Sequence, residues 1–127
     1  MQADLSLTKR TADVPTFTRN AESLGFDGLW LGETRSDPFL AMALASQASE
    51  RIRLGTGVAI AFARTPMTLA YTAYELAGLT RGRFVLGLGS QVEAHVRRRF
   101  SMPWSAPAAR MREFVQALRA IWDAWQS

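Results

Sequence analysis

The amino-acid sequence predicts an α/β fold with a parallel sheet, from three observations. Strand-like and helix-like segments alternate along the 127 residues. The strands start near residues 3, 27, 52 and 83, so they recur every 24 to 31 residues, the length of a βα unit with a right-handed crossover. The strands are also near-continuous apolar runs, which is typical of a sheet that is covered on both faces.

The first unit begins with a short strand over residues 3–7, where apolar and polar side chains alternate. Asp13 and Pro15 predict a helix start, with the aspartate as its cap and the proline in its first turn. Gly25 predicts a left-handed end to this helix. The second unit then begins with a short buried strand over residues 27–32.

The second helix has the same kind of start, the pair Asp37–Pro38, and is expected to continue through residues 39–50. The third strand covers residues 52–60 and is interrupted by Gly55 and Gly57. Glycines inside a strand indicate a bulge or a close approach of another group to the backbone. The interruption can reflect a nearby ligand or unusual backbone geometry, or simply a barrel bend.

The last two units carry the longer helices. Pro66 opens a helix that continues through Leu79, and a fourth strand follows over residues 83–88. A loop with a short helix over residues 91–99 comes next, and Ser105 is predicted to cap a long amphipathic helix. The apolar positions of that helix are Met111, Phe114, Val115, Leu118, Ile121, Trp122 and Trp125.

The composition excludes several classes of protein. No run approaches the roughly 20 apolar residues of a membrane-spanning helix, and the opening residues do not resemble a signal peptide. With no cysteine and a single histidine, no metal site is expected. The apolar fraction of 48% is too high for a disordered chain. A globular, cytoplasmic protein is therefore expected.

The net charge of +4 arises after residue 80, where eight arginines accompany three acidic residues. The densest run, Arg97–Arg99, is interpreted first as a solvated helix face and second as an anion site, because guanidinium groups suit phosphate and carboxylate. No aromatic platform is interleaved with this run, so nucleic-acid binding is not expected. His95 is interpreted as structural or exposed rather than catalytic.

Ligands of parallel α/β folds bind beyond the carboxyl ends of the strands. This rule selects the loops over residues 32–37, 61–66 and 87–95. Glu33 directly follows the second strand, where a carboxylate could act as an acid or base or bond the polar edge of a ligand ring. It could equally pair with Arg35 or Arg64, and the residues alone leave both interpretations open.

The loop after the fourth strand contains Gly87 and Gly89 but is not a dinucleotide-binding fingerprint, because Val92 stands where a third glycine is needed. Its glycines do offer backbone without side-chain bulk at a strand end, which suits a phosphate group or a flat ring.

Three motifs carry a resemblance to a known family: GFDGLW at 25–30, RIRLGTGV at 51–58 and GRFVLGLG at 82–89. Together they resemble the bacterial-luciferase-like flavin and deazaflavin oxidoreductases, in particular the subgroup described as coenzyme F420-dependent. The resemblance implies four βα units equivalent to the N-terminal half of a TIM barrel, with the cofactor at the carboxyl ends of the strands. It also implies hydride transfer between that cofactor and a small organic substrate.

The resemblance further implies roles for individual residues. Glu33 matches the family's acidic residue after the second strand, but Thr34 stands where some relatives have histidine. A non-proline cis peptide that supports the ring is expected at Gly57–Val58. The cofactor contacts implied are Gly57, Val58, Ala59, Ile60, Gly89, Ser90 and Gln91, with Arg64 for the anionic tail. No role is carried over to Val92 or Glu93, which lie near the position of a glutamate in some relatives.

The chain length conflicts with a complete barrel, which takes at least about 200 residues. Residues 1–127 are therefore predicted to be a single half-barrel domain. It could be a fragment that lacks its C-terminal half, a homodimer that closes eight strands, or an open four-stranded sheet. Its function is predicted as a coenzyme F420-dependent oxidoreductase, with FMN as the alternative cofactor, or the cofactor-binding half of one. The other prediction is a non-catalytic half-barrel that oligomerises and binds no cofactor.

Overall fold

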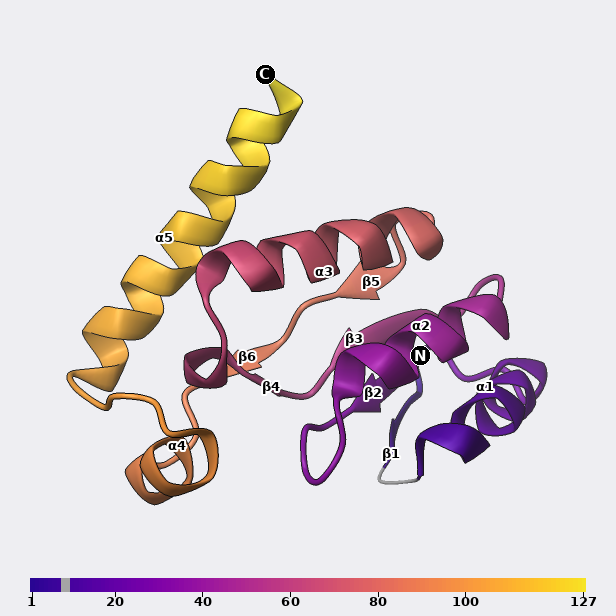
Figure 1. Ribbon diagram of the computed structural model, residues 1–127. Coiled ribbons are helices and arrows are strands. Elements are labelled where there is room, and N and C mark those ends of the chain that lie inside the picture. Colours follow the sequence, from indigo (N-terminus) through magenta and orange to yellow (C-terminus); the bar gives the residue numbers. More distant parts are fainter. Residues whose placement is uncertain (8–9) are drawn as a thin grey trace. The chain divides into compact units, whose positions relative to one another are not determined.

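The computed structural model describes residues 1–7 and 10–127 (Figure 1). The chain divides into two compact units. The first unit contains residues 1–59 and 75–88, and the second contains residues 60–74 and 89–127.

The first unit is built on a four-stranded parallel sheet. Its strands are β1 (Asp4–Leu7), β2 (Gly28–Leu31), β3 (Arg53–Thr56) and β5 (Phe84–Val85), in the order β1-β2-β3-β5. Between them the chain forms a short 3₁₀ turn (Thr11–Asp13) and the helices α1 (Val14–Ser23) and α2 (Pro38–Gln47). The predicted parallel sheet and its alternation with helices are confirmed.

The two faces of this sheet differ in exposure, whereas the apolar strands predicted that both faces would be covered. Leu29 and Leu54 are partners in the register and are fully buried on one face. The other face carries Asp4, which is exposed, together with the partly exposed Trp30 and Arg53. The strands of this chain are too short for an apolar run to distinguish one buried face from two.

Two predicted strands are each divided in the structure. The third becomes β3 and β4 (Ala59–Ile60), and the fourth becomes β5 and β6 (Leu88–Gly89). β4 and β6 form a separate two-stranded sheet. The glycines in each segment gave the local signal for these breaks.

Helix α3 (Pro66–Leu79) has the predicted bounds, and its C-terminal turn contains Arg81 and Gly82 with positive φ angles of 54° and 83°. Gly25 likewise has the predicted left-handed conformation, with φ of 88°. Helix α2 ends earlier than predicted, at Gln47 rather than at residue 50.

The two aspartates predicted as helix caps behave differently. The Asp37 carboxylate accepts a hydrogen bond of 2.8 Å from the backbone N–H of Phe39, so it caps α2 as predicted. Asp13 already has helical angles and makes no capping bond; its carboxylate lies 3.5 Å from Arg10 Nε instead. Asp13 therefore occupies the predicted cap position, but its carboxylate does not act as the cap, because the preceding 3₁₀ turn gives this residue helical angles.

This difference predicts unequal effects of two matched substitutions. Asp37→Ala is expected to lower the free energy of unfolding by about 1 kcal/mol, because the Phe39 N–H loses its acceptor. Asp13→Ala is expected to change it by less than about 0.5 kcal/mol, because an exposed ion pair contributes little. Urea denaturation of both variants beside the wild type measures the two values, and equal losses would contradict the assignment of the caps.

The second unit contains a short 3₁₀ turn (Ala61–Ala63), α4 (Glu93–Phe100) and α5 (Pro107–Gln126). The short helix expected near residues 91–99 is confirmed as α4. Ser105 does not cap α5: the cap position is Ala106, whose carbonyl accepts from Arg110 N–H at 2.9 Å. Pro107 suits the first helical position because it has no N–H that needs an acceptor.

Helix α5 packs along an apolar stripe, as its sequence predicts. Phe114 and Leu118 are buried, and Trp122 Nε1 donates to the Ala70 carbonyl at 3.2 Å. The Trp125 ring stacks on Tyr71 at a centroid distance of 5.8 Å. These contacts confirm the packing role predicted for the last two tryptophans. Among the described residues, no helix combines the length and the apolar character needed to cross a membrane.

Candidate functional site

Within the first unit, the exit of β2 and the segment after β3 are joined by two backbone hydrogen bonds. The Gly57 N–H donates to the Leu31 carbonyl at 2.9 Å, and the Glu33 N–H donates to the Val58 carbonyl at 3.1 Å. The peptide bond between Gly57 and Val58 is cis, as the resemblance implied. The structure therefore brings Glu33 and the Gly57–Val58 pair together at the carboxyl ends of two neighbouring strands.

This part of the backbone is packed too closely for larger residues. A Cβ atom on Gly32 would lie 3.0 Å from the Gly57 carbonyl oxygen. Gly57 itself is exposed, and the Val58 side chain is 46% exposed. An exposed backbone without a side chain, beside the apolar side chain of Val58, leaves room for a planar ring to approach. The residues present thus fit a flavin or deazaflavin ring at this position.

Gly87 connects the segment after β5 to the end of β3. Its N–H donates to Thr56 Oγ1 at 2.9 Å, while its carbonyl accepts from the Thr56 hydroxyl at 2.8 Å and from the Ala59 N–H at 2.8 Å. Thr56 is 1% exposed, so its hydroxyl serves as a buried link where the regular strand ladder stops. Sequence reasoning did not select Thr56; the only signal was a polar residue between Gly55 and Gly57.

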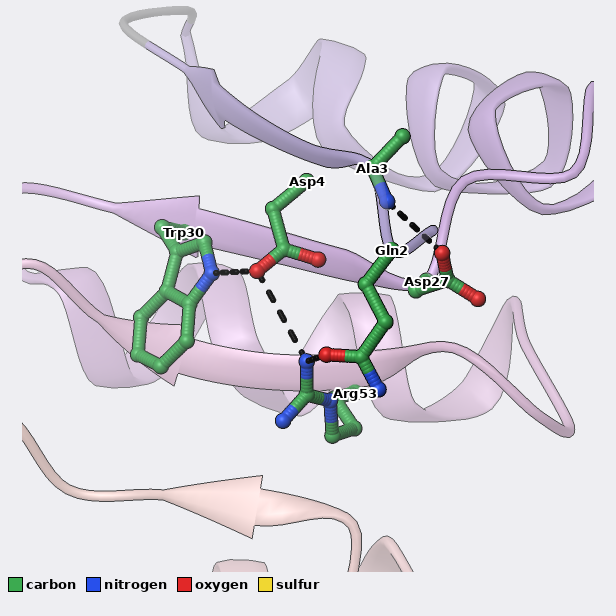
Figure 2. A network of polar contacts seen from close by, with 6 residues as sticks. All are labelled: Gln2, Ala3, Asp4, Asp27, Trp30 and Arg53. Atoms are coloured by element: carbon green, nitrogen blue, oxygen red, sulfur yellow. Dashed lines mark hydrogen bonds and ion pairs between the residues drawn. The ribbon is translucent and has the colours of Figure 1, made fainter.

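A second contact that the sequence did not reveal lies on the uncovered face of the sheet (Figure 2). Trp30 Nε1 donates to Asp4 Oδ2 at 3.1 Å, and the same oxygen lies 3.7 Å from Arg53 Nη2. Arg53 Nη2 also donates to Gln2 Oε1 at 3.3 Å. The indole lies over Gly55, where a Cβ atom would come within 2.1 Å of the ring.

The predicted contacts Ala59 and Ile60 are buried residues, at 0% and 2% exposure for backbone and side chain together. Their contact with a cofactor stays a prediction. In the second unit, Arg64 Nη1 donates to the Ile60 carbonyl at 3.0 Å.

The glycine loop of the second unit has a turn at Gln91. The Gln91 φ angle is 61°, and its side-chain oxygen accepts from the Val92 N–H at 3.0 Å. Ser90 Oγ donates to the Gln91 carbonyl at 3.2 Å, and Gly89 is the last residue of β6. The roles of Gly89, Ser90 and Gln91 toward a cofactor stay predictions.

The basic run is located on α4 of the second unit. Arg97, Arg98 and Arg99 are exposed, as is His95. Arg97 Nε lies 2.7 Å from Glu93 Oε1, and Arg97 Nη2 donates to the Trp104 carbonyl at 3.2 Å. The three arginines are exposed and Arg97 is paired within the protein, which agrees with the solvated helix face that the sequence favours. In the part of the chain that the structure describes, no cluster of His, Asp and Glu could hold a metal ion.

Comparison with known proteins places this architecture in a family. A family model described as luciferase-like monooxygenase matches residues 2–126. The uncharacterized protein Rv1360 of Mycobacterium tuberculosis is 48% identical over 126 residues, which cover 99% of this chain and 37% of Rv1360. From the same organism, "Putative coenzyme F420-dependent oxidoreductase Rv3520c" is 36% identical over 103 residues, covering 80% of this chain and 30% of that protein.

Among solved structures, the oxygenating constituent of 3,6-diketocamphane monooxygenase from Pseudomonas putida, in complex with FMN, superposes with a TM-score of 0.84. The sequence identity is 19%, and the match covers 96% of this chain and 39% of that one. The likeness shows the fold: parallel βα units that correspond to about 40% of a TIM-barrel enzyme of this kind. The chain spans less than two-fifths of the length of these relatives. It belongs to the luciferase-like monooxygenase family of flavin- and F420-dependent enzymes.

Proposed function

We propose that this chain forms the cofactor-binding part of an F420-dependent oxidoreductase that acts on a small organic molecule in the cytoplasm. The observation that supports this proposal is the pairing of Glu33 with the exposed Gly57–Val58 segment at the strand ends. The name of Rv3520c supports coenzyme F420, and the FMN complex of the diketocamphane enzyme supports FMN as the alternative.

The chemistry of the proposed reaction is divided between cofactor and protein. When bound, the cofactor supplies the group that accepts or gives the hydride. The substrate that loses a hydride also loses a proton, and the reverse reaction needs both. Glu33 is proposed to accept a hydrogen bond from the polar edge of the cofactor ring and to take or give that proton. The Gly57–Val58 segment is proposed to orient the ring, supported from below by the buried residues Ala59 and Ile60. Gly89, Ser90, Gln91 and Arg64 are proposed to contact the rest of the cofactor.

Titration of the purified chain with coenzyme F420 and with FMN tests this function. Binding is expected to change the fluorescence of the cofactor, with the tighter of the two identifying the natural class. The absence of any change with either compound at high micromolar concentration would exclude a cofactor-binding role for this chain.

Glu33→Gln is expected to weaken cofactor binding by about tenfold, because a carboxylate is a stronger hydrogen-bond acceptor than an amide. The fluorescence titration measures this change. Glu113→Gln, on the exposed surface of α5, is the matched control and should bind like the wild type. Equal affinities for wild type and Glu33→Gln would remove Glu33 from contact with the cofactor.

A second candidate function is an assembly module without catalysis, a half-barrel that binds no cofactor. In the described part of the chain, β1 and β5 each have one strand neighbour in the four-stranded sheet. Unpaired strand edges favour pairing with another chain. We propose that a second copy, or a C-terminal half, covers these edges. Light scattering tests the homodimer: a strict monomer would contradict it.

A further inference from the structure

We propose that Trp30 is a positioning residue, whose indole holds the Gly57–Val58 segment, and through it the Glu33 backbone, in place for a bound ring. This inference rests on the proposed function, which supplies the ring. The indole belongs to the polar network of Asp4, Trp30 and Arg53 on the face of the sheet that carries Asp4 (Figure 2). The proposed chemistry does not otherwise use these residues.

The Trp30 ring lies over the neighbouring strand β3. Trp30 and Gly55 are partners in the register of β2 and β3. A Cβ atom on Gly55 would lie 2.1 Å from Trp30 Cζ3 and 2.4 Å from Cε3, so a glycine is required for the indole to lie over β3 at this point. The ring therefore covers the backbone of the neighbouring strand, two residues before Gly57.

Polar contacts fix the orientation of the Trp30 ring. Its Nε1 donates to Asp4 Oδ2 at 3.1 Å, and that oxygen also lies 3.7 Å from Arg53 Nη2. These polar contacts come from β1 and β3, on either side of β2. An indole with its N–H bound on one side and its ring packed on the other is held in one orientation.

The Trp30 side chain also lies close to the candidate site. A Cβ atom on Gly57 would lie 3.5 Å from Trp30 Cβ and 3.9 Å from Cε3, which is ordinary van der Waals distance. The Trp30 side chain thus borders the space beside the Gly57 backbone, and the Gly57 N–H donates to the carbonyl of Leu31, the residue after Trp30, at 2.9 Å. The next residue, Val58, accepts the hydrogen bond from the Glu33 N–H at 3.1 Å. A displacement of the indole is therefore expected to reach Val58 and Glu33 through the backbone of Leu31 and Gly57.

Three variants test the inference. Gly55→Ala displaces the ring by steric overlap without changing any polar group, and Trp30→Phe keeps a ring but removes the N–H. Gly78→Ala is the matched control, because a Cβ atom there meets nothing within 4 Å. Backbone amide NMR signals are recorded for each variant, together with the melting temperature and the affinity for FMN and for coenzyme F420. Trp30→Phe keeps the test decisive if Gly55→Ala does not fold.

In Gly55→Ala and Trp30→Phe, the amide signals of Val58 and Glu33 are expected to shift, while Gly78→Ala leaves them unchanged. The affinity for the cofactor is expected to fall by about tenfold or more, because small misplacements of positioning groups have large effects. A purely structural role would lower the melting temperature and leave the affinity of the folded protein unchanged, and that result would overturn the inference.

The same measurements separate a failure of the proposed function from a failure of this inference. A wild-type chain that binds neither cofactor contradicts the proposed function, while the amide signals still measure whether Trp30 holds the segment. Unchanged Val58 and Glu33 signals in the folded Trp30→Phe variant overturn the inference whatever the cofactor does. Shifted signals support it in the same way.

Discussion

Gly87→Ala is expected to lower the free energy of unfolding by about 3 kcal/mol, at the upper end of the range for adding a methyl group to a packed site. A Cβ atom on Gly87 would lie 2.1 Å from the carbonyl oxygen of Thr56. That oxygen belongs to the backbone at the end of β3, where Thr56 is paired in register with Leu31 of β2. It cannot rotate away as the end of a flexible side chain would.

The substitution also disturbs the hydrogen bonds around Gly87. Moving its backbone away from Thr56 lengthens the two bonds to the buried hydroxyl and the bond from the Ala59 N–H. Buried polar groups that lose their partners destabilise a protein by about 1–3 kcal/mol each. The steric and the polar effect act in the same direction, which is why a large loss is expected.

Gly78→Ala is the control for this prediction, since Gly78 lies in α3 with open space around it. Alanine in a helix is favoured over glycine by roughly 0.5–1 kcal/mol, so this variant should be slightly more stable than the wild type. Urea denaturation at one pH compares the three proteins. A loss below about 1 kcal/mol for Gly87→Ala would contradict the close approach of its backbone to Thr56.

The helices show what local sequence predicts well. Helix α3 begins at Pro66 and ends at Leu79 as predicted, because a proline start and an Arg81–Gly82 end are local signals. The cap of α5 was predicted one residue too early, at Ser105, because a hydroxyl suits a cap but the chain places Ala106 there. Residue type alone does not determine which of two neighbouring residues adopts the cap geometry.

The site shows what local sequence cannot predict. The residues alone left three interpretations of Gly55 and Gly57, a nearby ligand, unusual backbone geometry or a bend, and the resemblance was needed to expect a cis bond between Gly57 and Val58. The link between Thr56 and Gly87 joins residues 31 positions apart, so no local pattern contains it. The position of the Trp30 ring over Gly55 likewise depends on the register of β2 and β3.

Glu22→Gln is expected to lower the free energy of unfolding by about 1–2 kcal/mol at neutral pH, after allowance for the partial exposure of the group. The Glu22 carboxylate, at the end of α1, accepts hydrogen bonds from three consecutive backbone N–H groups in the turn before β3. The donors are Glu50 at 3.1 Å, Arg51 at 2.7 Å and Ile52 at 2.8 Å. An amide replaces a charged acceptor with a neutral one, and its NH₂ group cannot accept.

The same turn is held from its other side by Arg83. Its Nη1 donates to the Ile52 carbonyl at 2.7 Å, and its Nη2 donates to the Ser49 carbonyl at 3.2 Å. Burial lowers the pKa of Arg83, while the negative charge of Glu22 opposes this shift. Glu22 therefore stabilises the turn by direct hydrogen bonds and also favours the charged form of the arginine that binds its carbonyls.

The contribution of Glu22 depends on pH in a definite direction. Burial raises the pKa of its carboxyl, but the hydrogen bonds from Ile52, Arg51 and Glu50 and the charge of Arg51 together lower it below the ordinary value of 4.5. Because the unfolded chain binds this proton at a higher pH than the folded chain, Glu22 stabilises the folded state fully at pH values above 4.5. This stabilisation is lost as the pH falls through the lower pKa of the folded state.

Urea denaturation at neutral pH and at steps below pH 4.5 tests this linkage. The gap in unfolding free energy between wild type and Glu22→Gln is expected to narrow as the pH falls, because the wild type loses a charge that the variant never had. Glu75→Gln, on the exposed surface of α3, is the matched control and should differ from the wild type by less than about 0.5 kcal/mol at neutral pH. A gap of constant size for Glu22→Gln would mean that its hydrogen bonds do not depend on the carboxylate charge.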